Sequence, residues 1–214
     1  MLNQSDGQEP VATAYRREAG IKAKLLRRFR RDSKGLAALE FALILPVLIT
    51  MLFGMGELSL AIFCRTSVTQ VASTVADLVA QESAPTTSDL NNVYYAANSL
   101  LYPYYPDFSS SKPVIRITSV IFDTTTNSTT VGKVAWTCTQ SGSGTLTPAT
   151  RAKNSTVTFS QPLLSSGASV VMAEVAYSYS SPTTMLITGA INMKDSFHTK
   201  PRRVAQIPEP SACP

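Results

Sequence analysis

An apolar run of 23 residues, Phe41–Phe63, places the strongest constraint on how this chain folds, and Glu57 is its single charged residue. An α-helix rises about 1.5 Å per residue, so the run would be roughly 34 Å long, enough to cross a hydrocarbon core of about 30 Å. A soluble core rarely surrounds a helix that is apolar on every side over such a length. The run therefore predicts a transmembrane helix, to which we assign residues 36–64.

The net charge of +5 lies entirely on the N-terminal side of this run. Residues 1–35 carry nine Lys and Arg side chains against four Asp and Glu, and the charges after Gly35 balance. Clustered basic residues before a spanning helix keep that end in the cytoplasm, so the C-terminal part is predicted to be exported. Because the sequence pI of 9.2 comes from a short flank, no nucleic-acid partner is predicted.

The helix is predicted to continue beyond the membrane as an amphipathic segment. Apolar residues recur at helical spacing from Val68 to Val79, and Pro85 ends the pattern. Within the spanning part, Pro46 removes a backbone donor and is predicted to bend the helix. Residues 88–101 begin with a Ser-Asp cap and predict a second, shorter helix.

From Pro113 onward the apolar period changes to two, which predicts strands at residues 114–122, 133–138, 169–179 and 185–197. Ser181-Pro182 is a turn signal between the last two, which indicates a hairpin. The predicted class is α+β, with a mainly antiparallel sheet. The predicted parts are a basic cytoplasmic leader 1–35, a transmembrane helix 36–64, an amphipathic continuation 65–84, an exported domain 85–200 and an extended tail 201–214.

The sequence offers no catalytic or metal-binding constellation. His198 is the single histidine, and there is no CxxC pair, so neither a multi-histidine site nor a paired thiolate site is available. Ser143 stands directly between two glycines, which is too tight for a nucleophile elbow. We therefore expect neither enzymatic activity nor a cofactor.

Two of the three cysteines, Cys138 and Cys213, belong to the exported part, whose compartment permits disulfides. We predict that they form a bridge. Cys64 falls at the edge of the membrane segment.

Gly35 is the distinctive glycine and lies before the apolar run, whereas a secretory signal is cut after its apolar region. Cleavage between Gly35 and Leu36 would remove all the net positive charge and leave an ammonium group on Leu36, with Glu40 one turn further along. Pairing of Glu40 with the ammonium of a neighbouring subunit would offset the desolvation of the carboxylate and set the register between helices. The alternative is that Glu40 is an interfacial residue of an uncleaved anchor.

At these residues the chain resembles the TadE-like minor pilins or pseudopilins of the tight-adherence (Flp) type IV pilus system. The family pattern has a basic leader, a glycine, a glutamate followed by an aromatic residue, an early proline and a glycine-containing segment that ends in glutamate. The corresponding residues here are Gly35, Glu40, Phe41, Pro46, Gly54 and Glu57.

The resemblance implies a structural role in the assembly or initiation of a pilus, in the bacterial inner membrane with the C-terminal domain in the periplasm. Its implied partners are a prepilin peptidase that cuts between Gly35 and Leu36, other pilins or pseudopilins, and the inner-membrane assembly platform. Glu40, Phe41 and Glu57 would be the assembly and register residues. The alternative function is an uncleaved, signal-anchored extracytoplasmic module for binding or adhesion.

Overall fold

The computed structural model describes residues 34–102, 104, 112–122, 131–142, 144–147, 150–159 and 168–211. Most of the predicted leader and Cys213 lie outside these ranges. The chain divides into two compact units, Met1–Phe53 and Gly54–Pro214. A single helix, α2 (Lys34–Gln81), contributes to both, so the predicted continuation of the spanning helix into an amphipathic segment is confirmed.

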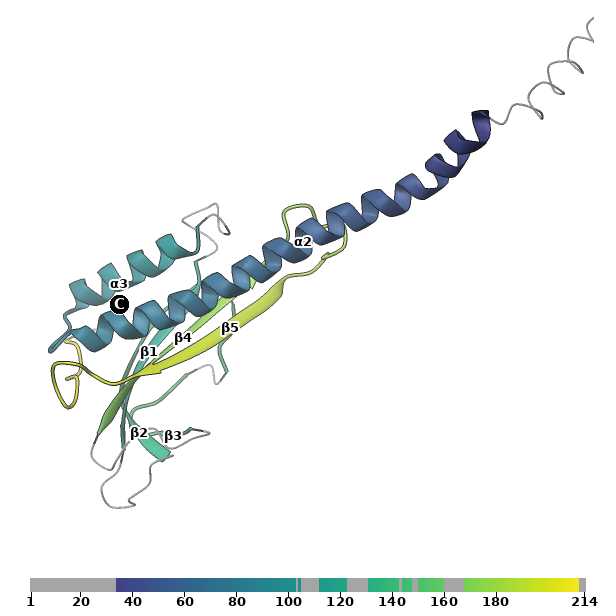
Figure 1. Ribbon diagram of the computed structural model, residues 1–214. Helices are drawn as coiled ribbons and strands as arrows, with labels where there is room; N and C mark the ends of the chain where they lie inside the picture. The colour runs from purple at the N-terminus through teal and green to yellow at the C-terminus, as the bar shows by residue number, and fades with distance from the viewer. Residues whose placement is uncertain are drawn as a thin grey trace, which may run out of the picture. The chain divides into compact units, whose positions relative to one another are not determined.

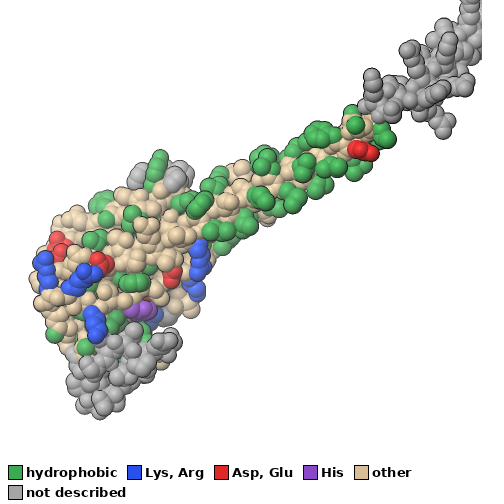
Figure 2. Space-filling view, in the orientation of Figure 1, with side chains coloured by type: hydrophobic (Ala, Val, Ile, Leu, Met, Phe, Trp, Pro, Cys, Tyr) green, Lys and Arg blue, Asp and Glu red, His purple; other side chains and the backbone are tan. Residues whose placement is uncertain are grey.

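In the first unit, α2 is covered by no other described part of the chain. Every residue from Gly35 to Phe53 is exposed, and nearly all of them are apolar, as Figure 2 shows for the hydrophobic side chains along this helix. By its length and composition, α2 could cross a membrane. The helix runs through Pro46 without interruption, and Thr50 Oγ1 donates to the Pro46 carbonyl oxygen at 2.8 Å. The bend at Pro46 stays a prediction.

The second unit combines the later turns of α2 with a short helix and a five-stranded sheet (Figure 1). The helix α3 (Thr87–Leu100) begins at a capping box in which Thr86 and Asp89 bond each other's backbone N–H groups. The pairings β1–β2, β1–β4, β2–β3 and β4–β5 are all antiparallel, in the order β3-β2-β1-β4-β5. The strands are β1 (Val114–Phe122), β2 (Val131–Gln140), β3 (Thr156–Thr158), β4 (Ser169–Tyr179) and β5 (Ile191–Thr199). The predicted α+β class and the terminal hairpin are confirmed.

The two helices pack on one face of the sheet, and alternation along the strands decides which side chains meet them. On β4, Val171, Ala173, Val175, Tyr177 and Tyr179 join the helix residues in the main hydrophobic cluster. Val170 and Met172 point to the other face and belong to a second cluster around Phe122 and Phe159. The sheet is therefore buried on both faces, and Glu174 on that second face is buried as well.

The prediction for the final strand was wrong at its beginning. Residues 185–190 read as strand because Met185, Leu186 and Ile187 are apolar, but β5 starts only at Ile191 and extends to Thr199. The three residues form an irregular turn whose backbone N–H groups bond a side chain of α2, so they are not available to a sheet neighbour.

The segment that follows this turn runs alongside α2 to the end of the helix. Thr69 Oγ1 on α2 donates to the Asp195 carboxylate on β5. At the helix end, the Arg202 N–H bonds the Ala80 carbonyl oxygen at 2.8 Å, and its guanidinium pairs with Asp77. The predicted extended tail is thus bound to the unit as far as it is described, and Trp136 Nε1 donates to the Ile207 carbonyl oxygen at 3.0 Å.

Candidate functional site

The residues predicted for cleavage and register lie together at the beginning of α2. Gly35, Leu36, Glu40 and Phe41 are all helical and exposed. Because Leu36 and Glu40 are four residues apart in a helix, they lie on the same face one turn apart. The segment therefore presents an acidic group beside the predicted new N-terminus. The roles of these residues stay predictions.

Glu57, the third predicted assembly residue, lies in a different environment, because it is only 2% exposed. It occupies the first position of the stripe that α2 buries against the second unit. The stripe recurs every three or four residues through Ala61, Cys64, Val68, Val71 and Val75. A carboxylate at such a position needs partners, since an unpaired buried charge is strongly destabilising.

The partners of Glu57 come from the turn after β4. Thr183 Oγ1 and the Met185 N–H, the latter at 2.7 Å, donate to Glu57 Oε1. The N–H groups of Leu186 and Ile187 donate to Oε2 at 3.0 and 2.8 Å. We call Glu57 together with residues 183–187 the Glu57 clasp. Four donors around one carboxylate make it a fixed structural link between helix and turn.

Two local features allow this turn to approach the helix. Thr184 adopts a φ of 48°, a left-handed conformation that is rare for a β-branched residue. A reversal of this kind lets successive N–H groups face one anion. On the helix, a Cβ at Gly54 would lie 3.3 Å from Leu186 Cδ1, so the glycine leaves room for the Leu186 side chain.

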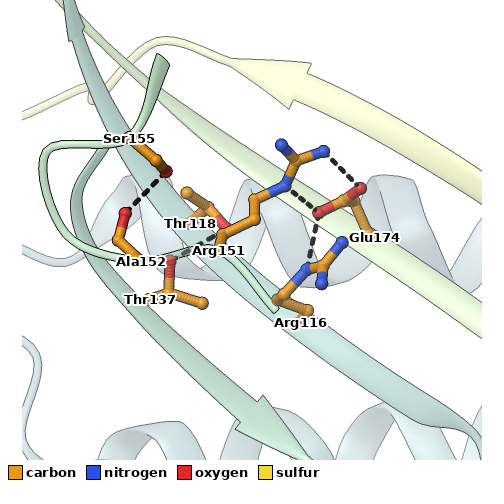
Figure 3. A network of polar contacts seen from close by, with 7 residues as sticks. All are labelled: Arg116, Thr118, Thr137, Arg151, Ala152, Ser155 and Glu174. Atoms are coloured by element: carbon orange, nitrogen blue, oxygen red, sulfur yellow. Dashed lines mark hydrogen bonds and ion pairs between the residues drawn. The ribbon is translucent and has the colours of Figure 1, made fainter. Parts of the chain in front are cut away.

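The second polar cluster lies on the opposite face of the sheet and joins three charged residues (Figure 3). Arg116 on β1 and Glu174 on β4 stand opposite each other in the strand register, with Arg116 Nε 2.8 Å from Glu174 Oε2. Arg151 reaches the same carboxylate with Nε and Nη2, both at 2.9 Å. Burial opposes ionisation of Glu174, but hydrogen bonds from Arg151 and Arg116 hold the pKa of the carboxyl below its usual value. The cluster ties β1, β4 and the segment before β3 together.

His198 lies near this cluster, and burial lowers its pKa below the usual 6.5. The Glu174 carboxylate acts in the opposite direction, and Arg151 adds to the lowering. The imidazole packs edge-on against the Phe159 ring, with centroids 5.2 Å apart. A histidine with a lowered native pKa binds fewer protons than in the unfolded chain, so stability falls as the pH drops below the unfolded value.

We therefore expect the melting temperature of the full chain in detergent to decrease between about pH 7.5 and about pH 5.5. The variant His198→Gln should lose most of this dependence, because it removes the group that titrates in this window. The pKa of Glu174 is lowered from its usual value, so this carboxyl stays ionised across the window and does not contribute. An equal decrease in both proteins would contradict the assignment to His198.

The described part of the chain contains two cysteines, of which one is free and one is disulfide-bonded. Cys64 is free and fully buried in the main cluster, whereas Cys138 is disulfide-bonded. Cys213 lies outside the described residues, so its pairing with Cys138 stays a prediction. No group of three His, Cys, Asp or Glu side chains suited to a metal ion occurs among the described residues.

Comparison with known proteins bears on the helix that carries Gly35, Glu40 and Glu57. Residues 35–77 match the family model described as TadE-like protein. This segment of the chain is therefore similar to TadE-like proteins. The match spans both the exposed apolar part of α2 and most of the stripe that begins at Glu57.

The match covers 43 of the 214 residues, all of them in α2, and it includes no part of α3 or of the sheet. Among the described residues, α2 is the one helix long and apolar enough to cross a membrane, which fits a single-pass membrane protein. No curated protein and no solved structure matches the chain.

Proposed function

We propose that this chain is a minor pilin or pseudopilin of the Tad (Flp) pilus system that takes part in the assembly or initiation of the pilus. The observation that carries the proposal is the TadE-like match at residues 35–77, which covers the predicted cleavage site, Glu40 and Glu57. The role is structural and operates through helix packing. The chain would be anchored in the bacterial inner membrane, with its N-terminus in the cytoplasm and the second unit in the periplasm.

Helix packing has an available surface in the first part of α2. The apolar side chains between Leu36 and Phe53 are exposed, and no described part of the chain covers them. In a bilayer they face lipid, and in a fibre they would face the helices of other pilins or pseudopilins. Each side chain that leaves lipid for a protein neighbour does so without a hydrophobic driving force, so packing and polar contacts decide the register.

Glu40 would supply the polar contact that fixes this register. After a prepilin peptidase cuts between Gly35 and Leu36, the new ammonium group of one subunit would pair with Glu40 of its neighbour. An ammonium–carboxylate pair in an apolar surrounding is strongly favoured over either group alone, since a single buried charge is costly. The inner-membrane assembly platform would bring the helices together.

The first test is the N-terminal residue of the protein isolated from its native membrane. We expect Leu36, because the peptidase removes the leader, and we expect the substitution Gly35→Leu to leave the leader attached. Intact mass spectrometry of the two proteins measures this directly. An uncut N-terminus in the parent protein would instead favour the signal-anchored binding module.

The second part of the test concerns Glu40. The variant Glu40→Ala should be processed and inserted normally, while its amount in sheared pili falls by about tenfold or more, which corresponds to at least about 1.4 kcal/mol. Glu82→Ala, which removes a carboxylate just beyond α2, is the matched control. Unchanged incorporation of the Glu40 variant would refute the register role.

A further inference from the structure

The turn that closes the Glu57 clasp carries two large apolar side chains on its outer surface. Met185 is 60% and Leu186 is 53% exposed, although their backbone N–H groups are fixed to Glu57. We call these two side chains the apolar tip. The hydrogen bonds fix the tip on the surface of the unit, with the Leu186 side chain beside Gly54, so its exposure is a property of the fold.

The tip lies beside a part of α2 that exposes apolar side chains as well. The clasp and the Leu186 contact place it at the level of Gly54–Glu57. On the same stretch of helix, Met55, Leu58 and Ile62 are exposed. Helix and turn thus form one apolar surface, and this level lies inside the run Phe41–Phe63, which is predicted to cross the membrane.

Charged residues border this surface on the side that faces the C-terminal end of α2. The turn contains none, and the first charge after it is the exposed Lys194 on β5. On α2, the first charge after Glu57 is the exposed Arg65, eight residues and about 12 Å further along. Asp195, which follows Lys194, is bonded to Thr69 on α2. The two cations Arg65 and Lys194 match the phosphate level of a lipid leaflet.

We propose that Met185 and Leu186 insert into the outer leaflet of the membrane that α2 crosses, so that the second unit rests on lipid at a fixed depth. The contact with lipid removes the two side chains from water, as in interfacial anchors. The clasp favours insertion, because the Glu57 carboxylate satisfies three backbone N–H groups of the turn that would otherwise lose their hydrogen bonds to water. The proposal depends on α2 spanning a bilayer and is independent of the role in a pilus.

The test uses tryptophan as a depth probe in the full chain, reconstituted in phosphatidylcholine liposomes whose acyl chains carry bromine. The parent chain has a single tryptophan, the buried Trp136, which provides the background signal. In Leu186→Trp the added emission should decrease about twofold or more in brominated lipid, as for a residue 5–10 Å inside the boundary.

The matched control is Phe197→Trp. Phe197 is also partly exposed on the same segment, six residues and about 20 Å beyond Ile191 along β5. Its emission should be the same in brominated and ordinary lipid. Equal quenching at positions 186 and 197, or none at either, would overturn the proposal.

The variant Met185→Trp keeps the test decisive if Leu186→Trp does not fold, and it should be quenched in the same way.

The alternative to a lipid contact is that the tip contacts a neighbouring protein chain. Position 186 would then be protected from brominated lipid more strongly at high protein-to-lipid ratio than at low ratio. Quenching that disappears in this way would overturn a lipid contact, whereas quenching that is independent of the ratio supports it.

Discussion

Replacing Glu174 with glutamine is expected to lower the free energy of unfolding by about 3–5 kcal/mol. The substitution keeps the size of the side chain but removes the negative charge that Arg116 and Arg151 share. Two guanidinium groups would then lie close together on the buried face of the sheet without their common carboxylate. For a chain of this length, the melting temperature should fall by roughly 10 °C.

Glu209→Gln is the matched control for this experiment. It removes the ion pair with Lys153, in which both side chains are more than half exposed. Exposed pairs contribute about 0–1 kcal/mol, so this variant should unfold close to the parent. Thermal unfolding of the three full-length proteins in the same detergent measures the difference, and similar losses in both variants would contradict a stabilising role for the buried cluster.

The second large effect is expected at Glu57. In Glu57→Gln, one of the two acceptor oxygens becomes an amide NH₂ group. Thr183 and Met185 share one oxygen while Leu186 and Ile187 share the other. If the NH₂ group replaces Oε2, it faces the N–H groups of Leu186 and Ile187. If it replaces Oε1, it faces the Met185 N–H, while the Thr183 hydroxyl can rotate and accept from it. Either way, at least one backbone N–H of the turn faces another donor. Amide hydrogen exchange at residues 185–187 should accelerate by about tenfold or more, because the turn opens more often.

Exchange in the central strands β1 and β4 should change much less, since the turn lies outside their pairing. Glu82→Gln makes the same chemical change just after the end of α2 and should leave the turn as slow as in the parent. Hydrogen exchange read by mass spectrometry of the full chain distinguishes these outcomes. If residues 185–187 exchange at the parental rate in the Glu57 variant, the clasp does not hold the turn.

The sequence was sufficient to predict the fold class because its signals are periodic. The apolar run, the stripe from Val68 to Val79 and the alternation along β4 each extend over many residues, so small local exceptions do not disturb them. The observed α3 and β4 agree with their predicted ranges within a residue at each end.

The role of Glu57 as the beginning of the buried stripe was missed, although the sequence contained a signal for it. Counting back from Val68 in steps of four, three and four residues reaches Cys64, Ala61 and Glu57, so the acid is in phase with the core positions. The residues that bind it could not be identified, because the apolar Met185, Leu186 and Ile187 resemble a strand. Only the tertiary contact explains why they turn instead.

The Arg116–Glu174–Arg151 cluster was beyond prediction for a different reason. Arg116 and Glu174 are 58 residues apart in the chain and meet because of the register between β1 and β4. A shift of the pairing by one residue would send these side chains to opposite faces. No local pattern in either strand determines that register.

The attachment of residues 183–202 to α2 has a mechanical consequence. Near one end, the Glu57 carboxylate binds the segment. At the other end, the Arg202 N–H donates to the Ala80 carbonyl oxygen, and the Thr69–Asp195 hydrogen bond lies between these two attachments. A pull along the helix axis therefore loads these attachments and the β4–β5 ladder together, in shear, instead of breaking them one after another. Force applied to the helix would therefore move the sheet with it as a single piece.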